Sequence, residues 1–200
     1  AEAYGKYEGG GFRDTWQAEK GWSAGAATAS IRHLEKISLK GSFSFDQTEG
    51  YGMCGSMFID PGFYPVDVLE FTPGRKTLQT YAFDGGIAYD LDGTWTIGAR
   101  MDFESSNLAK RKDLRHANWR LDMQVAPGVM YRTGGLALGF SPLFRKVAET
   151  INAEQIGTAE SSYYAFLDKG LMYGVHQVWT GSGIHLDEAG VNRLPLKEYS

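Results

Sequence analysis

The stretch TWTIGARMDFE, residues 94–104, sets the fold class of this chain. Every second residue in it is apolar, and the residues between them are polar, charged or glycine. A period of two residues is typical of a β-strand, whose successive side chains point to opposite faces. The preceding stretch, residues 80–90, alternates in the same way, and the sequence DLDG at 90–93 has the composition of a tight turn. Together they predict an antiparallel hairpin.

Similar alternation predicts further hairpins before and after this one. The strands expected from the sequence are about 3–11, 22–32, 36–46, 77–90, 94–104, 118–131 and 134–141. Long loops are expected at 47–76, 104–117 and 143–200, and partly helical spacing over 142–156 predicts a short helix or helical loop. Short and long connections alternate strictly, which is typical of the up-and-down β-barrels of outer membranes.

The composition agrees with a β-rich chain and excludes several classes of protein. Glycine accounts for 26 of the 200 residues, and aromatic residues make up 14%. The formal net charge of −4 excludes a strongly basic nucleic-acid binder, so we expect no nucleic-acid partner. One cysteine excludes a disulfide framework, and the lack of a run of about 18 apolar residues excludes a transmembrane helix.

Aromatic residues bracket the apolar faces of three of the predicted strands. Trp95 and Phe103 are eight positions apart, which corresponds to roughly 26 Å along a strand. A tilt of about 40° would reduce this to about 20 Å, close to the apolar band of a membrane β-barrel. We therefore expect an aromatic girdle in contact with outer-membrane lipid, formed by Tyr81, Tyr89, Trp95, Phe103, Trp119 and Tyr131.

The opposite faces of the same strands carry full charges of both signs. In a membrane barrel these side chains would line a polar interior, where opposite charges pair across strands. In a soluble sandwich they would face water instead, and the alternation itself is compatible with both arrangements. The residues expected to line the interior are Asp84, Arg100, Asp102, Arg120 and Asp122.

Few residues suggest catalysis or metal binding. Asp113 and His116 could form an acid/base pair on an external loop, but no G-x-S-x-G or H-E-x-x-H motif occurs. The four histidines lack metal-ligand spacing, so we expect no metal, no cofactor and no catalytic residue. The basic cluster at 110–116 is interpreted as a solvated loop, or as a contact with anionic lipid headgroups.

Two segments resemble a known group of proteins. The run SNLAKRKDLRHAN at 106–118, which leads into LDMQVAPG at 121–128, is similar to uncharacterised, porin-like outer-membrane β-barrel proteins of Bacteroidota. The segment KISLKGSFSFDQTE at 36–49 is similar to an early strand of the same proteins. The resemblance implies a location in the outer membrane of a Gram-negative bacterium and a longer barrel of which this chain is a fragment. It implies no catalytic or ligand-binding residues.

These observations predict an all-β, antiparallel up-and-down meander that forms a transmembrane β-barrel, incomplete in this chain. Residues 1–200 would be a single barrel domain or part of one. The expected role is a pore, or the membrane-embedded subunit of a surface complex that contacts other outer-membrane subunits through its long external loops. The alternative is a soluble all-β module that binds a glycan or a protein through the exposed aromatic residues Tyr51, Tyr64 and Trp179.

Overall fold

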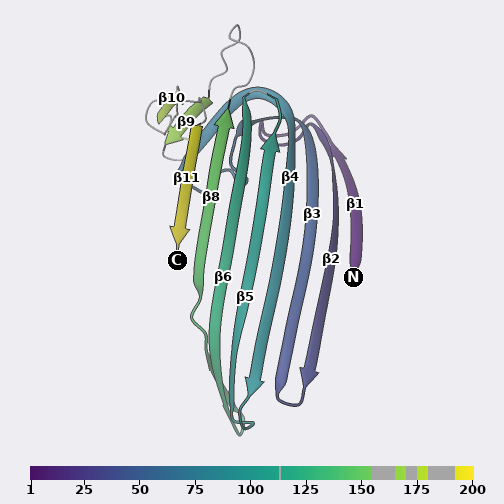
Figure 1. Cartoon of the computed structure of the whole chain (residues 1–200), viewed down its shortest axis with the longest axis vertical. Coiled ribbons are helices and arrows are strands. Elements are labelled where there is room, and N and C mark those ends of the chain that lie inside the picture. Colours follow the sequence, from purple (N-terminus) through teal and green to yellow (C-terminus); the bar gives the residue numbers. More distant parts are fainter. Residues whose placement is uncertain (113, 155–164, 170–174, 180–191) are drawn as a thin grey trace.

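The computed structural model describes residues 1–112, 114–154, 165–169, 175–179 and 192–200. The regular structure of these residues consists of eleven β-strands (Figure 1). The strands are β1 (Glu2–Gly9), β2 (Lys20–Leu34), β3 (Ile37–Ser56), β4 (Val66–Asp90), β5 (Trp95–Lys110), β6 (Arg115–Thr133), β7 (Leu136–Phe140), β8 (Phe144–Glu154), β9 (Ala165–Lys169), β10 (Val175–Trp179) and β11 (Asn192–Tyr199). In the described part of the chain, no helix has the length and apolar character needed to cross a membrane.

The strands form one antiparallel sheet in the order β1-β2-β3-β4-β5-β6-β8-β11. β7 pairs with the end of β6, and β9 pairs with both β10 and the beginning of β4. This confirms the predicted all-β, antiparallel up-and-down meander. The sheet is not closed within the described residues, because β1 and β11 lie at its opposite edges (Figure 1).

The central strands are much longer than predicted. All seven predicted segments overlap strands, but much of the loop expected at 47–76 and most of the one at 104–117 belong to β3, β4, β5 and β6. On β4 and β5, the face that is apolar near the turn at 90–93 becomes polar further from it. Gln79 and Asn107 are examples of the polar side chains there. The hydrophobic alternation therefore ends while the hydrogen-bonded ladder continues.

The region after residue 142 differs most from the expectation. Instead of a helix, residues 144–154 form β8, and the predicted loop at 143–200 also contains β9, β10 and β11. Val147 and Ile151 are both buried and lie on one face of β8, with Glu149 buried between them. Because a charged residue occupies this buried position, the strand alternation was hidden and the remaining spacing resembled a helix.

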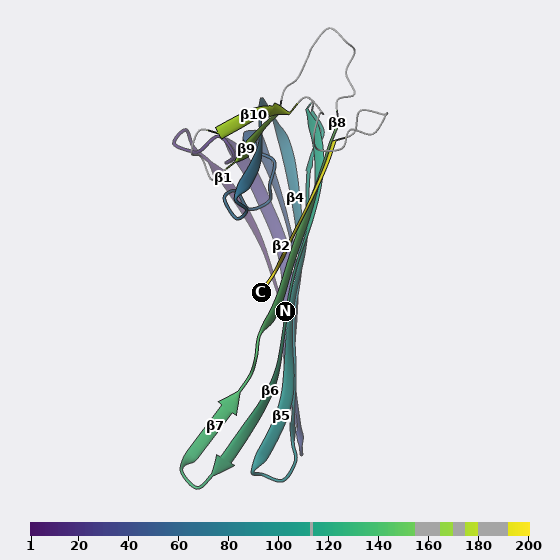
Figure 2. The same ribbon diagram turned by 90° about the vertical axis from the view of Figure 1, so that its left-hand side faces the viewer.

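The small hydrophobic core lies at one end of the sheet. The connection between β3 and β4, residues 57–65, folds onto one face there, on the same side as β9 and β10 (Figure 2). We call this connection the inner segment, the face it covers the inner face, and the opposite face the outer face. The core residues are Met57, Phe58, Tyr64, Val68, Leu114, Val147, Ile151 and Ala153.

Candidate functional site

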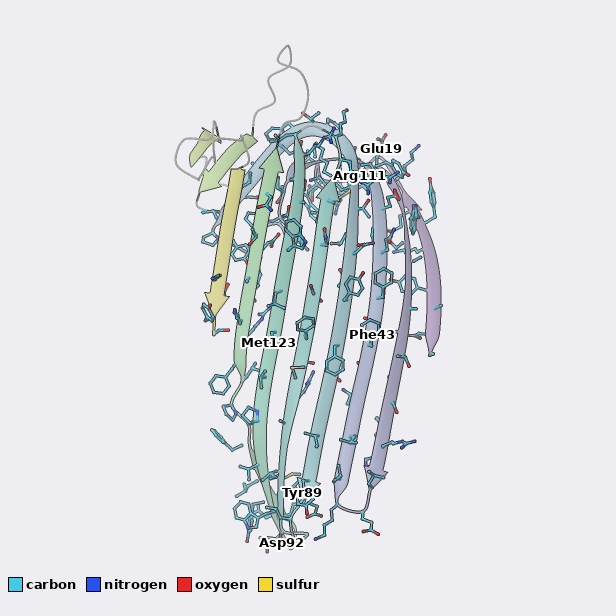
Figure 3. All side chains as sticks on the ribbon, viewed as in Figure 1. Glu19, Phe43, Tyr89, Asp92, Arg111 and Met123 are labelled. Atoms are coloured by element: carbon cyan, nitrogen blue, oxygen red, sulfur yellow. The ribbon has the colours of Figure 1, made fainter. Side chains whose placement is uncertain are left out.

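The outer face carries a continuous belt of apolar side chains that are exposed or half-buried. The strand register aligns them in rows, such as the row in which Phe43, Phe83, Phe103 and Met123 are successive cross-strand neighbours. Phe43 and Met123 lie at mid-height of the sheet (Figure 3). The belt comprises Ile37, Leu39, Phe43, Phe45, Tyr81, Phe83, Ile87, Tyr89, Trp95, Ile97, Met101, Phe103, Trp119, Leu121, Met123, Val125, Val129 and Tyr131.

Aromatic pairs lie toward both ends of this belt. At the end with the tight turns, the rings of Trp95 and Tyr131 are 4.8 Å apart. At the other end, those of Phe45 and Tyr81 are 4.9 Å apart. One position further along β3 and β4 on this face, the amide of Gln79 donates a hydrogen bond of 3.0 Å to Gln47, so the surface becomes polar. The predicted girdle residues Tyr81, Tyr89, Trp95, Phe103, Trp119 and Tyr131 all belong to the belt.

The inner face opposite the belt is polar and charged. Asp84 accepts ion-pair contacts from Lys40 at 2.6 Å and from Arg100 at 3.2 Å, and Arg100 also reaches Asp102 at 2.8 Å. The structure therefore brings together three of the five residues predicted to line an interior. Asp84 and Asp102 border an inner-face pocket of about 290 Å³ that is also lined by Glu104 and Asp122.

The other two predicted interior residues, Arg120 and Asp122, lie on the inner face closer to the core. Asp122 accepts two hydrogen bonds from the guanidinium of Arg145, one of them 3.0 Å from Nε to Oδ1. Arg120 is 9% exposed and has its guanidinium 4.8 Å from the ring centroid of Phe63 and 3.5 Å from Asp60. Arg120 therefore contacts the inner segment, with Asp122 3.8 Å away.

Hydrogen bonds hold the inner segment against the wall of the sheet. The fully buried side-chain amide of Asn118 donates 2.6 Å to the carbonyl of Met57 and 3.1 Å to Oε1 of Glu149. The same Glu149 oxygen accepts a 3.0 Å hydrogen bond from the backbone N–H of Ile59. The ammonium of Lys76 donates 2.9 Å to the carbonyl of Ser56, just before the segment. These hydrogen bonds therefore hold the backbone in place where the inner segment begins.

Aromatic packing corrects one of the predictions. Tyr64, expected to be exposed on a binding surface, is 5% exposed and packs between Phe58 and Phe63. Burial, together with the nearby charge of Glu149, raises the pKa of Tyr64 to about 12. Its loop folds inward because apolar residues flank it on both sides. Tyr51 is 36% exposed, and the side chain of Trp179 lies outside the described residues.

A buried charge cluster lies beside the inner segment. Glu70 is 0% exposed, and its Oε2 accepts 2.6 Å from Lys110 Nζ, while its Oε1 lies 3.7 Å from Lys76 Nζ. Burial lowers the pKa of Lys76 to about 8; the charge of Glu70 opposes this shift and that of Lys110 adds to it. The cluster combines two lysines with one carboxylate, and all three side chains are at most 2% exposed.

This cluster was not predicted, because its members lie in segments expected to be loops. The basic run 110–116 was interpreted as solvated, whereas Lys110 is 2% and His116 is 3% exposed. β5 continues to Lys110 and β6 begins at Arg115, so both buried side chains point to the inner face. The alternation of side chains along β5 could have indicated this burial, because Lys110 lies on the same face as Ser106 and Leu108.

The possible acid/base pair of Asp113 and His116 cannot be assembled from the described residues, since Asp113 lies outside them. His116 is buried and its Nδ1 lies 2.9 Å from Oδ1 of Asn118. Since the Asn118 amide nitrogen already donates twice, its oxygen accepts from His116, which assigns the proton to Nδ1. Burial, with the charges of Lys76 and Lys110, lowers the pKa of His116 to about 3.

Neutral His116 makes the stability of the fold dependent on pH. An unfolded histidine titrates near 6.5, so between about pH 6.5 and pH 3 the unfolded chain binds a proton that the folded chain does not. Stability should therefore fall with decreasing pH in this window, by about 1.4 kcal/mol per unit from this group. We expect His116→Gln, which retains a donor but cannot titrate, to flatten the decline in denaturant midpoints. Parallel curves for both proteins would contradict the assignment.

Within residues 1–112, 114–154 and the shorter described stretches, no group of three or more His, Cys, Asp and Glu side chains could hold a metal ion. The model of a family of unknown function (DUF6850) matches residues 1–182. No curated protein matches the chain, and no solved structure matches it.

Proposed function

The chain belongs to a family of unknown function (DUF6850), and we propose that it is a β-barrel protein of the outer membrane of a Gram-negative bacterium. The observation that carries the proposal is the opposite character of the two faces of the same strands. The outer face of β3, β4, β5 and β6 exposes the apolar belt, and the inner face carries Asp84, Arg100 and Asp102. The resemblance to porin-like proteins of Bacteroidota agrees with this proposal.

The belt has the dimensions and composition that a bilayer requires. From Tyr89 to Tyr81 on β4 it covers eight residue steps, or roughly 26 Å of strand. The tilt of strands in membrane barrels, about 40°, brings this close to the height of their apolar band. In water, large side chains such as Phe43 and Trp119, which are 45% and 49% exposed, would form an unusually extensive apolar patch. Contact with lipid would remove the free-energy cost of exposing these side chains to water.

A bilayer also requires the sheet to be closed. Unpaired backbone N–H and C=O groups of an edge strand cost several kcal/mol each in hydrocarbon. The proposal therefore requires the edges at β1, β2, β7 and β11 to pair with further strands, supplied by another part of the protein or by other outer-membrane subunits. Lipid and such subunits are the partners that we propose.

The position of the inner segment is compatible with a pore whose interior is narrowed by this segment. It lies on the inner face beyond the belt, where Asn118 and Glu149 hold its backbone. A pore with this segment would be constricted at the end away from the tight turns. We propose a pore, or a membrane-embedded subunit of a surface complex, without catalysis.

Neighbouring positions on opposite faces test the proposal. Met101 lies in the belt and Asp102 lies on the inner face of the same strand. In a Cys54→Ser background, we expect a nitroxide label at Met101→Cys to collide with oxygen dissolved in the bilayer. A label at Asp102→Cys should collide with a water-soluble nickel chelate instead. Electron paramagnetic resonance in liposomes measures both.

Two further label positions serve as a control for local disturbance. Phe83→Cys and Ala82→Cys repeat the comparison on β4, one in the belt and one on the inner face. If labels on both faces collide mainly with the nickel chelate, the belt does not face lipid and the membrane proposal is wrong. A chain that remains monomeric in buffer without detergent would support the soluble binding module instead.

A further inference from the structure

A pocket of about 510 Å³ lies at the end of the sheet beyond the belt. It opens between the connection of β1 to β2, residues 10–19, and the inner segment. Glu19, in this connection, marks the end of the sheet opposite Tyr89 and Asp92 (Figure 3). The volume of this pocket is within the usual range for small-molecule sites. The side chains on which the inference depends are Phe12, Trp16, Ser23, Thr48 and Lys76.

One wall of the pocket is fixed in place by close backbone contacts. The N–H of Cys54 donates 3.0 Å to the carbonyl of Thr15, and the N–H of Glu19 donates 2.8 Å to that of Tyr51. Gly55 has a φ of +79°, and a Cβ at this position would lie 2.8 Å from Oγ1 of Thr15. A glycine is therefore required for the connection to approach β3 this closely. The wall is a built part of the fold.

Aromatic side chains on this wall remain open to solvent. Trp16 is 39% exposed, and Phe12 is fully exposed. Near them the hydroxyls of Ser23 and Thr48 form a hydrogen bond of 3.0 Å, which leaves each oxygen able to accept another. The pocket thus combines flat apolar surfaces with neutral hydrogen-bonding groups.

The charged side chains around the pocket already have partners. Glu8 pairs with Lys6, and Arg13 donates 3.0 Å to the carbonyl of Gln17. Glu49 pairs with Arg75 at 2.6 Å on the outer face. The ammonium of Lys76 is bonded to the carbonyl of Ser56 and lies near Glu70, so it is not free for an anion. This pairing favours an uncharged ligand over an ionic one.

We propose that this pocket binds a neutral saccharide. A sugar ring has an apolar C–H face, which packs on an indole, and a rim of hydroxyls, which pair with groups such as Ser23 and Thr48. Trp16 would be the stacking surface. The inference goes beyond the proposed function, because the pocket lies outside the belt and requires no bilayer.

The test uses the full chain in micelles of a detergent without a sugar headgroup, which would otherwise compete. Maltohexaose, cellohexaose and mannohexaose are titrated while tryptophan fluorescence is followed, and binding is confirmed by calorimetry. We expect at least one to bind, with Trp16→Ala weakening binding at least about tenfold. Trp16→Phe should retain most of the affinity, and Trp95→Phe in the belt should leave it unchanged.

A second variant and a charged probe keep the outcome interpretable if Trp16→Ala does not fold. Gly55→Val should displace the wall without removing an aromatic ring, and it should weaken binding too. The proposal is overturned if none of the three neutral sugars binds, or if only a heparin-derived hexasaccharide binds. Binding that survives Trp16→Ala would also overturn it. None of these outcomes affects the label experiment on the belt.

Discussion

Replacing Glu70 by glutamine should destabilise the fold by about 3–5 kcal/mol, the range found when one partner of a buried ion pair is removed. Glu70 is 0% exposed, and its two oxygens lie 2.6 Å from Lys110 Nζ and 3.7 Å from Lys76 Nζ. Glutamine preserves the shape but leaves two buried ammonium groups without a carboxylate. Denaturant unfolding in micelles measures the loss.

The pH dependence of this variant provides a second readout. In the native protein the pKa of Lys76 is about 8, whereas an unfolded lysine titrates near 10.5. Between these values the unfolded chain binds more protons, so stability increases with pH. Without Glu70 the pKa of Lys76 should fall further, because the carboxylate that opposes the shift is gone. We therefore expect Glu70→Gln to regain part of its stability as the pH rises, beginning below pH 8.

Matched variants distinguish the stability loss caused by removing a buried charge from that caused by removing an exposed one. Asp102→Asn removes a carboxylate from the ion pair with Arg100, whose side chain is 62% exposed, so it should cost no more than about 1 kcal/mol. Adding Lys110→Met to Glu70→Gln removes one uncompensated ammonium and should recover part of the loss. If Glu70→Gln costs no more than Asp102→Asn, the cluster does not carry the charges described above.

The hairpin around residues 90–93 could be predicted because each of its strands has one apolar and one polar face. Asp92 accepts hydrogen bonds from the N–H groups of Thr94 and Trp95, as the turn composition suggested. The alternation shows which residues share a face. In the structure, the residues predicted to form the girdle lie on the outer face, and those predicted to line an interior lie on the inner face. It does not show what each face contacts, because the same pattern suits lipid outside a barrel and water outside a sandwich.

The buried polar cluster could not be predicted, for a different physical reason. Glu70 and Lys110 are 40 residues apart, and only the long ladder between β4 and β5 brings them together. Charged residues in a glycine-rich stretch usually indicate a solvated loop, which is how 47–76 and 104–117 were interpreted. Their burial depends on the beginning of β4, where the carbonyl of Thr72 also accepts 2.6 Å from Lys110, and no local pattern marks a segment that folds inward.

Asn118→Asp should release the inner segment from the sheet. The substitution keeps the size of the side chain but removes the two N–H donations, at 2.6 Å to the carbonyl of Met57 and at 3.1 Å to Glu149. It also places a second carboxylate against Glu149 in a site where both residues are at most 1% exposed. An orphaned buried acceptor and an unpaired buried charge together should cost about 3 kcal/mol or more. Hydrogen exchange should then show faster exchange at residues 57–65.

The control for this prediction is the same substitution on the opposite face of the neighbouring strand. Asn107→Asp should leave exchange in the inner segment unchanged, because Asn107 lies on the outer face as the cross-strand neighbour of Trp119. Adding Glu149→Gln to Asn118→Asp removes the repulsion and restores one amide-to-carboxylate hydrogen bond. Protection should then return in part, since the carbonyl of Met57 still lacks its donor. If the chain forms a pore, the single variant should also increase conductance in planar bilayers, and the double variant should reverse part of that increase. Equal exchange in Asn118→Asp and Asn107→Asp would show that the apolar core alone holds the segment.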